Sequence, residues 1–182
     1  LGPSLPAITD FDASLPLVRP SLGLTVESVR AVATAARCLV TIENLASFHD
    51  ATRSPGAASA LLLYTGGMPS PAWRGAYARV LASLPPALPV YHWGDIDEGG
   101  FRIAAVLAAT AQAAGRRLQP WMMSPSDLPG ALLAQAGAPA AASLAAMLRG
   151  AERSGWSAVA DQLRQRPIRL EQESLEPLLP GA

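Results

Sequence analysis

Three acidic side chains directly follow two apolar segments of the sequence. Glu43 follows the run CLVTI, whereas Asp95 and Asp97 follow the run LPVYHW, with Glu98 beside them. In an open parallel sheet, ligands bind beyond the carboxyl ends of the strands, so acids at these positions can meet at one edge. Clustered carboxylates repel one another and favour a cation. Mg²⁺ suits such a cluster, because it prefers oxygen ligands and can promote hydrolysis of a phosphodiester.

Each acid also has an ordinary structural explanation. An Asp in a loop before a helix is commonly its N-cap, and this explanation fits Asp97 or Glu98. Glu43 alone fits a surface acid in a loop. Further along, Glu171 and Glu173 are either additional ligands or solvent-facing acids in the first turn of a helix, where the helix dipole favours them, and we prefer the second interpretation. Two acidic strand ends together favour a site over these separate explanations.

The elements that must position the acids alternate along the chain, which predicts an α/β fold with a parallel sheet flanked by helices. Short runs of apolar residues predict strands, and helical spacing of apolar residues predicts helices. The predicted strands are residues 38–42, 57–64, 88–93 and 117–122. The predicted helices are residues 25–36, 71–84, 101–114, 140–149, 154–165 and 171–179. Gly115 is the expected C-cap of the helix at 101–114.

The two ends of the chain differ from its middle. Residues 1–30 are expected to be an N-terminal arm or linker, in which Ile8 to Ala13 and Leu15 to Val18 form short strands or an extended segment. Residues 31–182 are expected to form one domain that includes a helical C-terminal tail. Because the chain starts with Leu1 rather than Met, we expect it to continue a longer protein.

Composition excludes several classes of protein. Half of the 182 residues are hydrophobic and 15% are charged, which is typical of a globular chain rather than a disordered one. One cysteine and two histidines exclude a zinc cluster or a disulfide within one chain. No apolar run approaches the roughly 20 residues of a membrane span, so we expect a cytoplasmic protein without a membrane partner.

Any affinity for nucleic acid must come from local arginines, because the formal net charge is zero. Arg102 is the best candidate for a contact with a DNA phosphate, since it is close to the acids in sequence, and Arg74 is a second one. His49 and the Gly66-Gly67 pair are weaker candidates for the same site, and a plain turn is the preferred explanation of the two glycines.

Two segments carry a family resemblance. IENLASF at residues 42–48 and HWGDIDEGGF at residues 92–101 resemble the signature motifs of the Toprim domain, a Rossmann-like parallel sheet with one Glu and an Asp-x-Asp pair at its strand ends. Their form most resembles the C-terminal domain of JetD, the nuclease subunit of the Wadjet anti-plasmid system, which is related to the topoisomerase VI and meiotic double-strand-break branch. RLEQE at residues 169–173 resembles a short motif near the end of that family, and the likeness covers roughly residues 35–175.

The resemblance implies a function. It implies that Glu43, Asp95 and Asp97 are catalytic and bind Mg²⁺, which Mn²⁺ can replace, with Glu98 as a further ligand. The implied reaction is hydrolysis of phosphodiesters in double-stranded plasmid DNA by a homodimer that works with the subunits of an SMC-like complex. Water is the expected nucleophile, because the three tyrosines are best explained as packing residues: Tyr64, Tyr77 and Tyr91.

Three alternatives stay open. A topoisomerase VI-like cleavage subunit would need a partner domain that carries the active-site tyrosine, and DNA covalently bound to protein would favour it. The domain is a non-catalytic binding or dimerisation module if it binds neither Mg²⁺ nor Mn²⁺. A doubly wound phosphotransfer domain also gathers acids at strand ends, but it needs a lysine at a later strand end, and this chain has no lysine.

Overall fold

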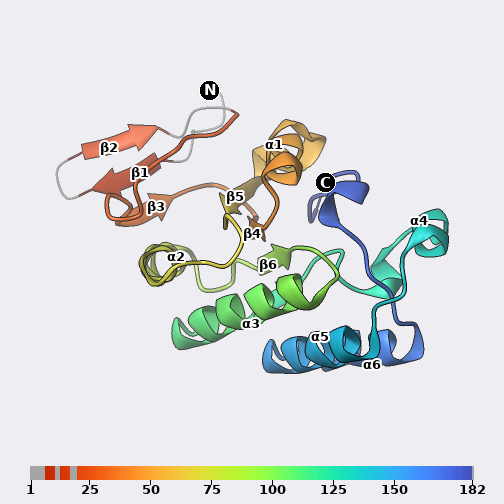
Figure 1. Ribbon diagram of the computed structural model, residues 1–182. Helices are drawn as coiled ribbons and strands as arrows, with labels where there is room; N and C mark the ends of the chain where they lie inside the picture. The colour runs from red at the N-terminus through yellow and green to blue at the C-terminus, as the bar shows by residue number, and fades with distance from the viewer. Residues whose placement is uncertain (1–6, 11–12, 17–19, 182) are drawn as a thin grey trace.

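The computed structural model describes residues 7–10, 13–16 and 20–181, and its elements alternate as the sequence predicts in the middle of the chain (Figure 1). The strands are β1 (Ala7–Asp10), β2 (Ala13–Pro16), β3 (Ala31–Ala33), β4 (Cys38–Ile42), β5 (Ala60–Tyr64), β6 (Val90–Trp93) and β7 (Leu118–Pro120). The helices are α1 (Leu45–Arg53), α2 (Pro71–Ser83), α3 (Glu98–Ala113), α4 (Gly130–Gln135), α5 (Ala141–Arg153) and α6 (Ser157–Gln165). Short 3-10 turns cover Pro55–Ser59, Pro125–Asp127 and Gln172–Ser174.

A parallel sheet with strand order β5-β4-β6-β7 forms the centre of the chain. All five side chains of β4 are buried, because helices and the C-terminal segment cover both faces of the sheet. β4 and β6 are neighbours, with Ile42 opposite Trp93 in the register. The predicted α/β fold is therefore confirmed, and the two strands that end in acids lie side by side in the middle of the sheet.

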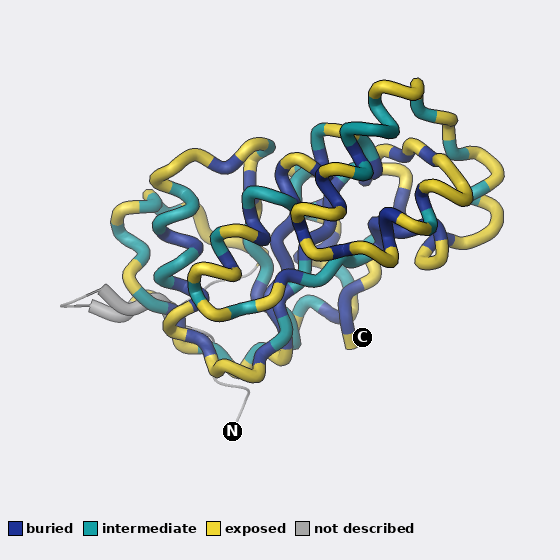
Figure 2. The backbone as a smooth tube through the Cα atoms, turned by 90° about the horizontal axis from the view of Figure 1, so that it is seen from below, coloured by how far each residue is buried: buried dark blue, intermediate teal, exposed yellow. Residues whose placement is uncertain are grey.

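The helices form layers on the sheet (Figure 1). α1 lies on one face, and α2 and α3 lie on the other, as right-handed crossovers between parallel strands require. α5 packs against α3, and α6 packs against α5. The tube in Figure 2 shows buried segments through the middle of the molecule and exposed segments along its outer helices. Within the described residues no helix is long and apolar enough to span a membrane; the longest, α3, has 16 residues.

The N-terminal part differs from the prediction. The helix expected at residues 25–36 is wrong, since this stretch contains a turn and β3, which joins β1 and β2 in a small antiparallel sheet of order β2-β1-β3. Tertiary contacts outweigh the local helical pattern here, because the Val32 amide donates to Ser83 Oγ of α2 at 3.0 Å. The strands expected near residues 8–13 and 15–18 are present as β1 and β2, and residues 11–12 and 17–19 lie outside the described part.

The C-terminal segment is extended rather than helical. The helix expected at residues 171–179 is wrong: only one 3-10 turn forms, and the chain then runs across the face of the sheet beside α1. The segment starts at the carboxyl end of the sheet, where Gln172 lies, and ends at the amino end, where the Arg37 guanidinium donates to the Gly181 carbonyl at 2.8 Å. Leu175 and Leu179 are buried along this path. The last residues of the chain therefore complete the core and pass directly beside the acidic strand ends.

Candidate active site

Glu43 and Asp95 meet at the carboxyl end of the sheet although they are 52 positions apart in sequence. The β4–β6 ladder continues to the Glu43 amide, which donates to the Trp93 carbonyl at 3.2 Å. Two residues past the end of β6, the Asp95 amide donates to Glu43 Oε2 at 3.3 Å. The sheet register therefore brings these two predicted site residues together.

Asp97 caps α3, as the structural explanation of its position anticipates. Its Oδ1 accepts a hydrogen bond from the Gly100 amide at 2.8 Å. Its charge still acts on the site, because it raises the pKa of both Glu43 and Asp95. Glu98 follows it in the first turn of α3 and is exposed. Asp97 is thus both a helix cap and a member of the acidic cluster.

The carboxylates disfavour each other's charge. Burial, followed by repulsion from Asp95, raises the pKa of Glu43 to about 7, and Asp97 and Glu171 add smaller repulsions. The pKa of Asp95 is also raised, mainly by burial; repulsion from Glu171 and Asp97 and a hydrogen bond with the Glu171 carboxyl add to this, while the Gln172 amide opposes it. The repulsion between these carboxylates is relieved when the cluster binds a cation or a proton.

The raised pKa of Glu43 predicts how stability depends on pH without metal. Between pH 4.5 and about 7 the folded protein holds a proton on Glu43 that the unfolded chain releases, so stability falls as pH rises through this window. In a chelator, Glu43→Gln should therefore be more stable than the wild type at pH 8 by about 1–2 kcal/mol, after allowing for solvent screening, and equally stable at pH 4.5. Urea unfolding at both pH values measures this difference, with the exposed Glu176→Gln as control. An equal gap at both pH values would contradict the assignment.

The C-terminal segment adds residues that the sequence interpretation set aside. Glu171 and Glu173 are exposed, as expected, but they are not simply solvent-facing acids of a helix. Glu171 interacts with the Asp95 carboxyl, and Glu173 accepts from the Asn44 side chain at 2.6 Å. Gln172 between them is buried and contacts both strand ends. The RLEQE segment was the sequence signal for these residues, because Gln172, at their centre, lies 77 positions after Asp95.

His92 and Gly94 form the back of the site. His92 is fully buried, its Nδ1 lies 2.9 Å from Thr41 Oγ1, and burial lowers its pKa to about 4, so the ring is neutral at physiological pH. A Cβ atom at Gly94 would lie 2.6 Å from Glu43 Oε2 and 2.9 Å from His92 Nε2. Glycine at this position therefore lets the Glu43 carboxylate lie directly against the backbone in front of the imidazole.

An open cavity of about 630 Å³ lies in front of the acids. Its lining includes two residues for which we did not expect, or only weakly expected, a place in the site. Tyr64, expected to be a packing residue, is 37% exposed at the end of β5 and lines the cavity. His49 of α1 also lines the cavity. Gly66 and Gly67 both have positive φ, which supports a turn, and Gly67 also borders the cavity. The lining comprises Glu43, Asn44, Leu45, Ala46, His49, Tyr64, Gly67, Asp95 and Glu173.

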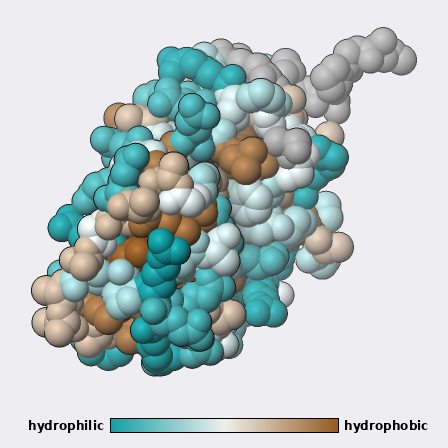
Figure 3. Space-filling view, turned by 90° about the vertical axis from the view of Figure 1, so that its right-hand side faces the viewer, coloured by the Kyte–Doolittle hydropathy of each residue, from teal (hydrophilic) through white to brown (hydrophobic). Residues whose placement is uncertain are grey.

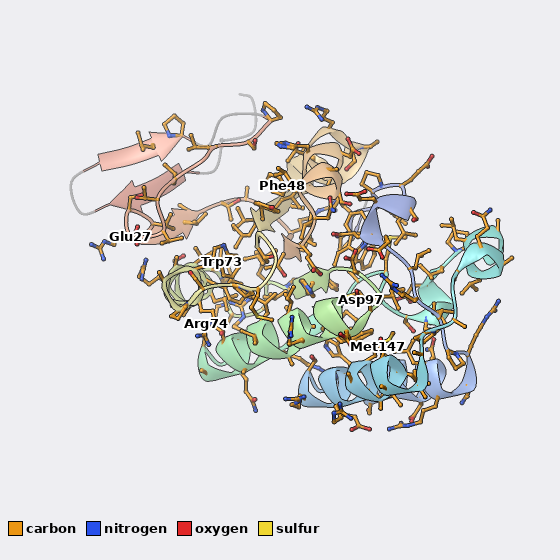
Figure 4. The ribbon with its side chains drawn as sticks, in the orientation of Figure 1. Glu27, Phe48, Trp73, Arg74, Asp97 and Met147 are labelled. Carbon is orange, nitrogen blue, oxygen red and sulfur yellow. The ribbon has the colours of Figure 1, made fainter. Side chains whose placement is uncertain are left out.

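The two predicted DNA-contacting arginines lie on different helices. Arg102 is exposed one turn into α3, the helix that Asp97 caps. Arg74 belongs to α2 and is labelled to the left of Asp97 in Figure 4. Among the described residues that line the cavity, neither arginine is present. Arg102 is therefore better placed than Arg74 for a substrate bound at the acids.

The donor atoms suit a hard divalent cation. Glu43, Asp95, Asp97 and Glu171 supply carboxylate oxygens, the ligands that Mg²⁺ prefers, and their mutual repulsion is what a cation would relieve. In the part of the chain that the structure describes, no three His, Cys, Asp or Glu side chains are grouped tightly enough to hold an ion as they stand. One Asp97 oxygen accepts from the Gly100 amide at the start of α3.

Comparison with known proteins identifies the family. No curated protein matches the sequence. The sequence model of the family described as Wadjet protein JetD, C-terminal, matches residues 8–179, which is nearly the whole chain. The match includes both acidic strand ends and the C-terminal segment that packs against them. This chain therefore belongs to the JetD C-terminal family of the Wadjet system.

Proposed function

We propose that this domain is a Mg²⁺-dependent DNA endonuclease that hydrolyses phosphodiesters of plasmid DNA within the Wadjet defence system. The main support is the meeting of Glu43 and Asp95 at adjacent strand ends, in an open cavity where burial and repulsion raise the pKa of both. Membership of the JetD family supplies the biological setting. The predicted homodimer, the SMC-like partner subunits and the cytoplasmic location belong to the same proposal.

Glu43, Asp95 and Asp97 are the residues that would hold the metal, and Mn²⁺ would serve in place of Mg²⁺. The bound cation supplies charge for the phosphate oxygens and a more acidic water. The chain's own residues position these groups. Asp97 is held against the start of α3 by the Gly100 amide, and Glu43 is held by the Asp95 amide. Because the pKa of Glu43 is about 7, its carboxyl group can exchange a proton at neutral pH.

Arginines and the open cavity would receive the DNA. Figure 3 faces the side toward which β6 points in Figure 1 and shows apolar and polar side chains interspersed there. Because the formal net charge of the chain is zero, contacts with a DNA backbone would be made by individual arginines. We assign this role to Arg102 first and Arg74 second, with Glu98 as an auxiliary ligand at the start of α3.

Tyr64 supports one alternative, a topoisomerase-like cleavage. Its exposed side chain borders the cavity. In that reaction the phenol oxygen would form a bond to phosphorus, the sugar oxygen would leave with a proton, and DNA would stay attached to the protein. Tyr64→Phe distinguishes the two reactions: hydrolysis by water survives the change, whereas covalent cleavage does not.

Removal of the metal tests the proposed function directly. The full-length protein, assembled with its Wadjet partners, should linearise closed plasmid DNA in Mg²⁺ or Mn²⁺ and lose this activity in a chelator, with recovery on adding metal back. A gel assay for plasmid linearisation gives the readout, and phenol extraction without protease shows whether protein is attached to the ends. Undiminished cleavage in the chelator would refute the metal-dependent proposal.

A further inference from the structure

The side chain of Gln172 joins the ends of the two strands that carry the acids. Its Oε1 accepts from the Asn44 amide at 2.8 Å, and its Nε2 donates to the Trp93 carbonyl at 2.9 Å. Asn44 directly follows Glu43, and Trp93 is the last residue of β6. Gln172 is 1% exposed; its hydrogen bond to Trp93 is buried and the one from Asn44 is partly buried.

The main chain of the same residue holds one of the acids. The Gln172 amide donates to Asp95 Oδ1 at 2.7 Å. Two residues earlier, Leu170 exchanges a pair of backbone hydrogen bonds with Ile96, at 2.8 and 3.2 Å. The C-terminal segment is thus hydrogen-bonded to the Asp95 carboxylate and to the backbone of the next residue, Ile96.

A physical reason favours an amide at this point. The β4–β6 ladder ends where the Glu43 amide meets the Trp93 carbonyl, and the two chains then diverge into α1 and the loop before α3. The side-chain amide of Gln172 has the acceptor and the donor of a peptide group. It therefore bridges the Asn44 amide and the Trp93 carbonyl, where the two backbones no longer bond directly to each other. Without it, the partly buried Asn44 amide would lose the acceptor that it has in the structure, which is costly.

From these contacts we propose that Gln172 is a positioning residue, which fixes the separation of the Glu43 and Asp95 carboxylates so that they share one cation. This proposal rests on the proposed function. The two carboxylates repel each other, so without a fixed frame their strand ends would move apart. Residues that support metal ligands in this way typically change metal affinity by 10- to 100-fold when they are altered.

The test compares two matched substitutions in the full-length protein. Gln172→Met keeps the length of the side chain and removes both amide hydrogen bonds. Gln162→Met does the same to a half-buried glutamine of α6, whose Oε1 accepts from Ser124 and Ser126. We expect Gln172→Met to weaken Mn²⁺ binding by 10- to 100-fold in calorimetry, with cleavage partly restored at high Mn²⁺ concentration. Gln162→Met should leave Mn²⁺ affinity unchanged at a similar loss in unfolding midpoint.

Three other results would each overturn a defined claim. If Gln172→Met binds Mn²⁺ as tightly as the wild type, or if both variants weaken binding equally, Gln172 has a structural role only. If the wild type binds Mn²⁺ but cuts no DNA, the proposed function fails, while the affinities still decide the role of Gln172. If the wild type binds no Mn²⁺, both proposals fall.

Discussion

Asp95→Asn is expected to lower the rate of metal-dependent DNA cleavage by roughly 10²- to 10⁴-fold, the largest effect on activity that we predict for a single side chain. The change removes a charge and preserves the shape of the side chain, whose Oδ1 can still accept from the Gln172 amide. It also removes a repulsion that burial intensifies. The metal-free variant should therefore be at least as stable as the wild type, so a loss of cleavage cannot be ascribed to unfolding.

The measurement is a single-turnover cleavage assay at saturating Mg²⁺, combined with thermal unfolding in a chelator. Asp50→Asn is the control, because Asp50 is an exposed acid of the neighbouring helix α1 that forms an ion pair with Arg53 at 3.8 Å. It should cut DNA at the wild-type rate. Equal rates for Asp95→Asn and the wild type would show that the acidic strand ends are not the active site.

The sequence predicted the central sheet because burial leaves a local signature. β4 is a continuous run of apolar and β-branched residues, as expected for a strand covered on both faces. The helix α1 was missed, because its buried positions are small or polar, Ser47, Ala51 and Thr52, and its start depends on a cap. Asn44 supplies that cap by accepting from the Ala46 and Ser47 amides.

Part of the candidate site could also be predicted from the sequence. Glu43 and Asp95 could be paired in advance, because the carboxyl ends of parallel strands meet at one edge. The roles of Glu171 and Gln172 could not be derived, since they depend on how the C-terminal segment crosses the sheet, and no periodicity encodes that path. The raised pKa of Glu43 likewise depends on burial and on charges far away in sequence.

Gly100→Ala should have the largest effect on stability among the substitutions at the site. A Cβ atom at Gly100 would lie 2.1 Å from the Asp95 carbonyl oxygen and 3.1 Å from the Asp95 amide nitrogen. Both are backbone atoms, so no side-chain rotation can relieve the overlap, and the start of α3 must move away from the loop that carries Asp95 and Asp97. We expect a loss of about 3 kcal/mol in the free energy of unfolding.

The same movement would displace the Asp95 carboxylate from Glu43, so cleavage should fall together with stability and should not recover at low temperature, where the variant is folded. Gly130→Ala is the matched control: it adds a methyl group at the start of α4, where nothing lies within 4 Å, and should raise stability by about 0.5–1 kcal/mol. Urea unfolding and the plasmid assay measure both quantities. A Gly100→Ala protein with wild-type stability would mean that α3 does not pack this tightly on the Asp95 loop. Full activity at reduced stability would mean that the position of α3 does not affect cleavage by the acids.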